Sequence, residues 1–154
     1  MQFDDKIGSI QQIITATNIG ILRRQAILKE LNLKKNQTII DIGCGGGHLV
    51  EKIAMCVGPS GKAIGVDPSD FQINTAKERC KHLSNVEFLC NAANDIDIED
   101  NSCDAVTFTQ TLEYIDNVDE ALHAAKRLQK PMSNFVNVST LWDFFGFHGP
   151  EKEL

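Results

Sequence analysis

The sequence predicts an α/β fold, a doubly wound parallel sheet of about five strands with helices on both faces. Three observations predict it. Short apolar segments alternate with segments of helical periodicity, which is the pattern of β-α-β units. The short segments are apolar at successive positions, as strands buried on both faces require. A glycine-rich turn joins the first predicted strand to the next helix, and right-handed crossovers then place the strands in one sheet.

The predicted elements follow one another between residues 9 and 138. A first helix is expected over residues 9–33, broken near Gly20. Ser69 and Gln72 form a capping box that opens a later helix, and Asn117 caps another. The first helix is expected to bury Ile10, Ile13, Ile14, Ala26, Ile27, Leu28 and Leu31. The strands are expected at residues 38–42, 63–66, 86–89, 105–108 and 135–138.

The helix after the first strand has the clearest amphipathic pattern. The helix before the fifth strand is expected to end at Pro131, because the residue that precedes a proline is disfavoured in helical conformation. The amphipathic helix is expected to bury Leu49, Val50, Ile53, Ala54 and Val57.

Composition limits the classes of function. A chain of 154 residues with 42% hydrophobic and 23% charged residues is large enough for one core. The net charge of -6 argues against nucleic acid as a partner, because a phosphate backbone requires a basic surface. No apolar stretch approaches the roughly 20 residues that a membrane helix needs, and the N-terminus does not resemble a secretion signal. The sequence therefore predicts a cytoplasmic protein with no membrane partner.

The five cysteines argue against a metal site. They are widely spaced, no CxxC pair occurs, and no histidine pair has metal-ligand spacing. Buried thiols in a reducing compartment are expected instead.

A glycine-rich turn carries the strongest functional signal. Gly43, Gly45 and Gly47 follow the first strand, and the next helix directs its N-terminal amides toward whatever the turn binds. Asp41 ends the strand, where a carboxylate accepts from an ammonium group directly or through water. Asp67 ends the second strand, 26 positions later (67 minus 41), where an acid binds both hydroxyls of a ribose. Together they predict a site for a nucleoside with an amino-acid-like tail.

The segment 41–47, Asp-Ile-Gly-Cys-Gly-Gly-Gly, resembles the first motif of class I S-adenosylmethionine-dependent methyltransferases. The likeness runs from about Arg24 to Val138, and it is strongest with the branch that includes ubiquinone and menaquinone biosynthesis and small-molecule enzymes. It implies a Rossmann-like domain, S-adenosylmethionine as cofactor and a small-molecule methyl acceptor. The cofactor-binding residues that it implies are Asp41, Gly43, Cys44, Gly45, Gly47, Asp67, Pro68, Ala92, Ala93 and Gln110.

The sequence departs from the family pattern in two places. Ala92 occupies the position of the acid that usually binds the adenine amino group; Asn94 or Asp95 substitutes for it, or the contact is lost and amides near Ala93 meet the ring. The family sheet normally continues with two more strands, whereas 16 residues (154 minus 138) follow Val138. The chain is therefore expected to lack that C-terminal strand pair, which exposes the fifth strand as an edge.

Three regions are expected: an N-terminal helical segment at 1–35, the cofactor-binding domain at 36–140 and an aromatic tail at 141–154. The tail either caps the core or contacts a partner, and a homo-oligomer is expected through the fifth strand or the tail.

A small-molecule methyltransferase is the leading hypothesis. Its alternatives are a non-catalytic or truncated cofactor-binding module that works through a partner, and an NAD-dependent oxidoreductase. The last is disfavoured because the dinucleotide motif G-x-G-x-x-G requires glycine where His48 stands. Methyl transfer needs no obligatory acid or base, so no catalytic residue is assigned. The candidates near the acceptor are Gln110, Tyr114, Trp142 and His148.

Overall fold

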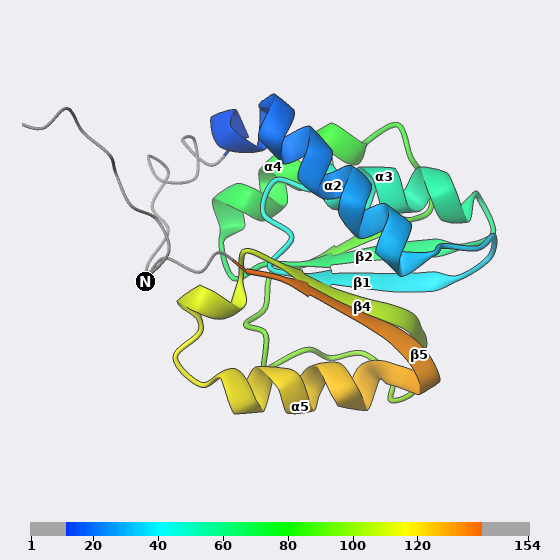
Figure 1. The fold of residues 1–154 in the computed structure, drawn as a ribbon, viewed down its shortest axis with the longest axis vertical. Helices are drawn as coiled ribbons and strands as arrows, with labels where there is room; N and C mark the ends of the chain where they lie inside the picture. Colours follow the sequence, from blue (N-terminus) through cyan, green and yellow to red (C-terminus); the bar gives the residue numbers. More distant parts are fainter. Residues whose placement is uncertain (1–11, 140–154) are drawn as a thin grey trace, which may run out of the picture.

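A parallel sheet of five strands forms the centre of the computed structural model, which describes residues 12–139 (Figure 1). Its order is β3-β2-β1-β4-β5, so the direction in which the chain winds reverses between β1 and β4. At such a switch point the loops diverge and leave a crevice at the carboxyl edge, where open α/β sheets bind ligands. The Rossmann-like fold class is confirmed. The strands are β1 (Thr38–Ile42), β2 (Lys62–Val66), β3 (Val86–Leu89), β4 (Cys103–Thr109) and β5 (Gln129–Val138).

Helices cover both faces of this sheet, with α2, α3 and α4 on one face and α5 on the other (Figure 1). Two predicted caps are confirmed. Ser69 Oγ accepts a hydrogen bond from the Gln72 amide at the start of α4, and the Asn117 side chain accepts from the Glu120 amide at the start of α5. The helices are α2 (Asn18–Leu31), α3 (His48–Val57), α4 (Asp70–Cys80), the 3-10 turn η1 (Leu112–Tyr114) and α5 (Val118–Leu128).

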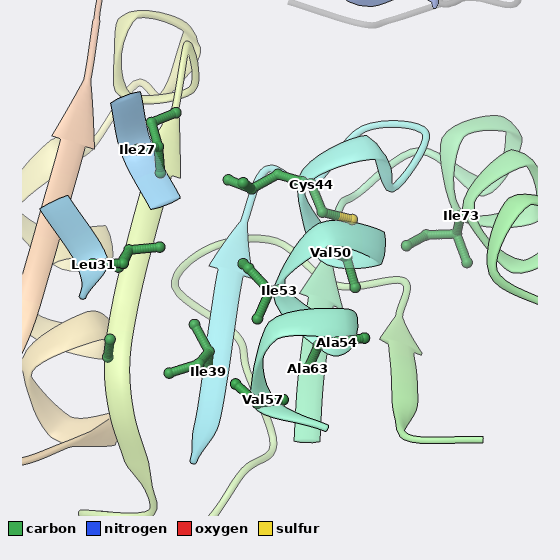
Figure 2. Packing of buried hydrophobic residues seen from close by; sticks show 12 residues of the cluster. Ile27, Leu31, Ile39, Cys44, Val50, Ile53, Ala54, Val57, Ala63 and Ile73 are labelled. Carbon is green, nitrogen blue, oxygen red and sulfur yellow. The ribbon is translucent and has the colours of Figure 1, made fainter. Parts of the chain in front are cut away.

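The core consists of one apolar cluster on each face of the sheet. β1 contributes to both, because alternate side chains point in opposite directions: Ile39 faces α3, and Ile40 faces α5. The predicted apolar face of α3 is confirmed, since all five of its residues are buried. Figure 2 shows Ile53 and Val57 of α3 beside Ile39, with Ile27 of α2 in the same cluster.

The prediction for the first helix was partly wrong. The break falls at Thr17, whose side chain accepts from the Gly20 amide and starts α2. Gly20 stays inside the helix, where an added Cβ would overlap the Thr15 carbonyl. Because the break changes the direction of the helix axis, Ile13 (70% exposed) and Ile14 (53% exposed) do not continue the stripe. Ala26 is exposed as well, whereas Ile27 and Leu31 are buried, and Ile10 lies outside the described residues.

The fifth strand is longer than predicted. α5 ends at Leu128 rather than at Pro131, and β5 begins at the next residue, six positions before the predicted start. Proline is tolerated there because β5 is the edge strand of the described sheet and pairs with β4 alone. The predicted exposed edge is confirmed for the described residues, while the aromatic tail, residues 141–154, lies outside them.

The prediction that the cysteines are buried was wrong for two of them: Cys56 and Cys90 are exposed, whereas Cys44, Cys80 and Cys103 are buried. Cys90 follows the last residue of β3, and Cys56 lies on the solvent side of α3. Among residues 12–139, no group of acidic, histidine or cysteine side chains has the arrangement of a metal site. Within the same range, no helix is long and apolar enough to cross a membrane.

We expect Ile53→Ala to lower the free energy of unfolding by about 2–5 kcal/mol, because it removes a fully buried side chain and leaves a cavity. Met55→Ala on the same helix is the matched control, since Met55 is 55% exposed and its change should stay within about 0.5 kcal/mol. Urea unfolding measures both. Equal losses for the two variants would contradict the packing described for α3.

Candidate functional site

The glycine-rich turn lies at the carboxyl edge of the sheet, between β1 and α3. Gly43 has a φ of +77°, and a Cβ there would overlap the side chain of Thr111, which packs on the turn from the loop after β4. Gly45 differs. Its φ of +50° favours glycine, but an added Cβ would meet nothing closer than Gln72 at 3.9 Å. Its backbone is therefore the part of the turn that a ligand can approach most closely.

Asp67 joins the turn directly. Its Oδ2 accepts from the Gly45 amide at 2.9 Å, and its Oδ1 accepts from the Ser69 amide at 2.9 Å. Burial raises the pKa of Asp67, and the Ser69 and Gly45 amides oppose that rise. The acid after β2 is thus in direct contact with the turn after β1.

Asp41 lies in β1, one residue before its end, and is buried, with 2% of its surface exposed. Its Oδ1 has no hydrogen-bond partner. Burial, with a smaller contribution from the charge of Asp67, raises the pKa of Asp41 to about 8. A buried carboxylate without a partner is costly, and a cation would relieve both the burial and the repulsion. The site can therefore accept a ligand that carries an ammonium group.

The remaining predicted residues lie along the same edge of the sheet. Cys44 is buried within the turn, and burial raises the pKa of its thiol. Gly47 starts α3 with a φ of +76°. Pro68 follows Asp67, and its carbonyl accepts from the Cys90 thiol at 3.7 Å. These residues accompany Asp41, Gly43, Gly45 and Asp67 in one cluster.

The loop after β3 contains Ala92 and Ala93. The Ala92 carbonyl accepts from the Asp95 amide at 3.0 Å, which closes a turn. The Asn94 side-chain amide donates to Glu120 of α5 at 2.9 Å, so its nitrogen is already bound away from the glycine turn. Of the two substitutes predicted for the missing acid, Asp95 is exposed and Asn94 is held by α5.

Gln110 links the ends of two strands after β4. Its backbone amide donates to the Val138 carbonyl at 2.6 Å, and its φ is +53°. Tyr114 lies four residues further, in η1. Burial and the neighbouring Glu113 raise the pKa of Tyr114. Trp142 and His148 lie outside the described residues.

Sequence reasoning missed three polar groups of β4 and the loop that follows it. Both carboxylate oxygens of Glu113 and the hydroxyls of Thr107 and Thr109 are buried without hydrogen-bond partners in the described structure. Thr107 and Thr109 lie in a mostly apolar strand, and Glu113 lies in the segment after β4, where only Gln110 and Tyr114 were candidates. A polar residue at alternate positions of a buried strand is the signal that would have found the threonines.

Sequence reasoning also missed two contacts of α4. The Gln12 side-chain amide, from the N-terminal segment, donates to Gln72 Oε1 at 2.8 Å. Arg79 donates to the Gly46 carbonyl of the glycine-rich turn at 2.7 Å. His48 starts α3. Burial and the charges of Arg79 and Arg24 lower the pKa of His48 to about 4, which leaves it neutral at pH 7.

Comparisons with known proteins agree with this geometry. A family model described as a methyltransferase domain matches residues 33–144. A demethylmenaquinone methyltransferase of Staphylococcus carnosus is 32% identical over 117 residues, which cover 76% of this chain and 48% of that protein. An uncharacterized 37.1 kDa protein of transposon Tn4556 from Streptomyces fradiae is 27% identical over 150 residues, which cover 97% of this chain and 43% of that protein.

A solved methyltransferase structure has the same fold. The S-adenosylmethionine-dependent methyltransferase of Aquifex aeolicus superposes with a TM-score of 0.79 at 26% identity and covers 90% of this chain and 73% of its own. The chain spans about half the length of the curated relatives that it matches.

We expect Asp41→Asn to stabilise the fold in a pH-dependent way. The pKa of Asp41 is raised in the folded state to about 8, against an ordinary value of 3.8. Its contribution to stability is thus fully present below pH 4 and is lost as pH rises through 8. Relative to the wild type, the asparagine variant should gain up to about 5 kcal/mol between pH 4 and pH 9, since one pKa unit corresponds to about 1.4 kcal/mol.

Urea unfolding of both proteins at several pH values measures this difference. Two results would contradict the burial of an unpartnered carboxyl at position 41. One is a difference in the free energy of unfolding that is constant across the pH range. The other is a wild type that becomes more stable relative to the variant at high pH.

Proposed function

The chain belongs to the methyltransferase-domain family, and from that premise we propose that it binds S-adenosylmethionine and transfers its methyl group to a small molecule. The hydrogen bond from the Gly45 amide to Asp67, whose charge also acts on the buried Asp41, is the observation that carries the proposal. It supports a site in which Asp67 binds the ribose and Asp41 the ammonium group. The relative from Staphylococcus carnosus acts on a small molecule, and the structure from Aquifex aeolicus is named for the same cofactor.

The residues present fit this cofactor. The unpartnered Asp41 oxygen suits the ammonium of its methionine part. Each Asp67 oxygen accepts one amide in the described structure and retains a lone pair for a ribose hydroxyl. The Gly45 backbone is open to close approach. The other predicted cofactor contacts, from Cys44, Pro68, Ala92, Ala93 and Gln110, remain part of this proposal.

When bound, the cofactor supplies an electrophilic methyl group on a cationic sulfur. The chain's own contribution is to hold and orient both reactants and to exclude water, which accounts for much of the rate of such reactions. We place the acceptor beside the loop after β4, near Gln110 and Tyr114. No residue is assigned as acid or base.

The proposal also covers the class of methyl acceptor, self-association and the location in the cell. The net charge of -6 supports a small molecule over a nucleic acid. Self-association through the free edge of β5 and a cytoplasmic location stay predictions. The relatives named as methyltransferases favour neither a non-catalytic module nor an oxidoreductase.

Calorimetry with S-adenosylmethionine, S-adenosylhomocysteine and NAD tests the proposal. We expect the first two to bind and NAD not to bind. Turnover is then assayed with radiolabelled S-adenosylmethionine and a panel of naphthoquinol, phenol and amine acceptors. Absence of binding to both sulfur compounds would overturn the proposal.

We expect Asp67→Asn to weaken S-adenosylhomocysteine binding by about 10- to 100-fold, because a hydrogen bond to a charged group contributes about 1.5–3 kcal/mol. Asp119→Asn is the matched control, since Asp119 is an exposed acid in α5, on the opposite face of the sheet. Equal affinity of both variants for the ligand would remove Asp67 from the site.

A further inference from the structure

Two buried polar side chains lie side by side in the centre of the sheet. Thr107 of β4 is the register partner of Asp41 of β1, and the strands are parallel, so their side chains share one face. Thr107 has 0% of its surface exposed and Asp41 has 2%. Thr107 Oγ1 and Asp41 Oδ1 each have no hydrogen-bond partner. Two such groups left unsatisfied at neighbouring positions are costly, and each is the natural partner of the other.

On the other neighbouring strand, Asp41 has no polar side chain opposite it. Its register partner on β2 is Gly65, which has no side chain. Beyond Thr107, the next position on β5 is Val136, which packs on the apolar cluster with Ile39. Within the described sheet, Thr107 is therefore the polar side chain directly opposite Asp41, and Thr109, two residues further along β4, is the next one on the same face.

The charged and titratable groups around Asp41 are few. Asp67, after β2, repels its charge, and the Cys44 thiol of the glycine turn interacts with both acids. On the helices above this face, Arg24 of α2 and His48 of α3 interact with Arg79 and Glu51.

We propose that Thr107 is a positioning residue for the charged form of Asp41, to which its hydroxyl donates. When a ligand ammonium reaches Asp41, the carboxyl releases its proton to solvent, and the Thr107 hydroxyl turns to donate to the carboxylate. This inference rests on the proposed function, because it takes the ammonium to be that of the cofactor.

The inference couples binding to pH. The pKa of Asp41 is about 8 without ligand, so most molecules are protonated at pH 7 and release about one proton on binding. Affinity for an ammonium ligand should then rise about tenfold per pH unit up to pH 8 and level off above it. Thr107 donates to the charged form of Asp41 and therefore favours release of the Asp41 proton.

Calorimetry with S-adenosylhomocysteine between pH 6 and 8.5, in phosphate and in Tris, measures both the affinity and the protons released. Thr107→Val keeps the side-chain shape but removes the hydroxyl. It should bind about tenfold more weakly at pH 7, and proton release at pH 8 should rise from about half a proton toward one. Thr107→Ser restores a hydroxyl and should behave as the wild type.

5′-Methylthioadenosine, which has the nucleoside but no ammonium, is the matched probe. Its affinity should show no such pH dependence and should be equal in the wild type and Thr107→Val. A purely structural role for Thr107 would instead weaken both ligands equally and leave the pH profile unchanged, and that result would overturn the inference.

The wild type alone also tests the inference. If it binds S-adenosylhomocysteine with an affinity that is flat from pH 6 to 8, the coupling is absent and the inference fails while the proposed function stands. If it binds neither ligand, the proposed function itself fails. Thermal unfolding verifies that each variant is folded, and Thr107→Ala replaces Thr107→Val if the latter is not.

Discussion

The hydrogen bond from the Gly45 amide to the Asp67 carboxylate is the contact on which the site depends. It joins the loop after β1 to the loop after β2 and fixes the turn in a conformation that the positive φ of Gly45 permits. The parallel pairing of β1 with β2 brings Asp41 opposite Gly65, two residues before Asp67. The relative positions of Asp41, Asp67 and the Gly45 backbone thus follow from the register of β1 and β2.

The same arrangement is costly for the fold. A carboxyl at position 41 is surrounded by apolar residues on one side and by the charge of Asp67 on another. Such groups are retained where they serve a ligand rather than the fold, because a cation restores the interactions that burial removes. The apolar faces of α3 and α5 provide the stability that allows this cost, since each packs fully on one side of the sheet.

Much of the fold could be predicted from the sequence, since five strands and the buried face of α3 follow directly from hydrophobic periodicity. The break at Thr17 could not be predicted. A polar residue between two helical segments indicates a cap only if the helix is already known to change direction there. The early start of β5 was hidden by Pro131, which excludes a central strand but not an edge strand. Which residues face one another across strands depends on register, and a single sequence does not give register.

That Asp41, Gly45 and Asp67 lie near one another could be predicted, because their residue types coincide with the carboxyl ends of neighbouring strands. The role of Thr107 could not be predicted, because it depends on which residue of β1 lies opposite Thr107. Glu113 was missed as well, because no pattern in the surrounding sequence marks its carboxylate oxygens as buried.

The most direct measurement of the central claim is a crystal structure of the chain with S-adenosylhomocysteine. Electron density for the ribose against Asp67, with the amino group of the ligand toward Asp41, is the result we expect. A ligand bound elsewhere, with the Gly45–Asp67 edge filled by protein side chains, would contradict the account.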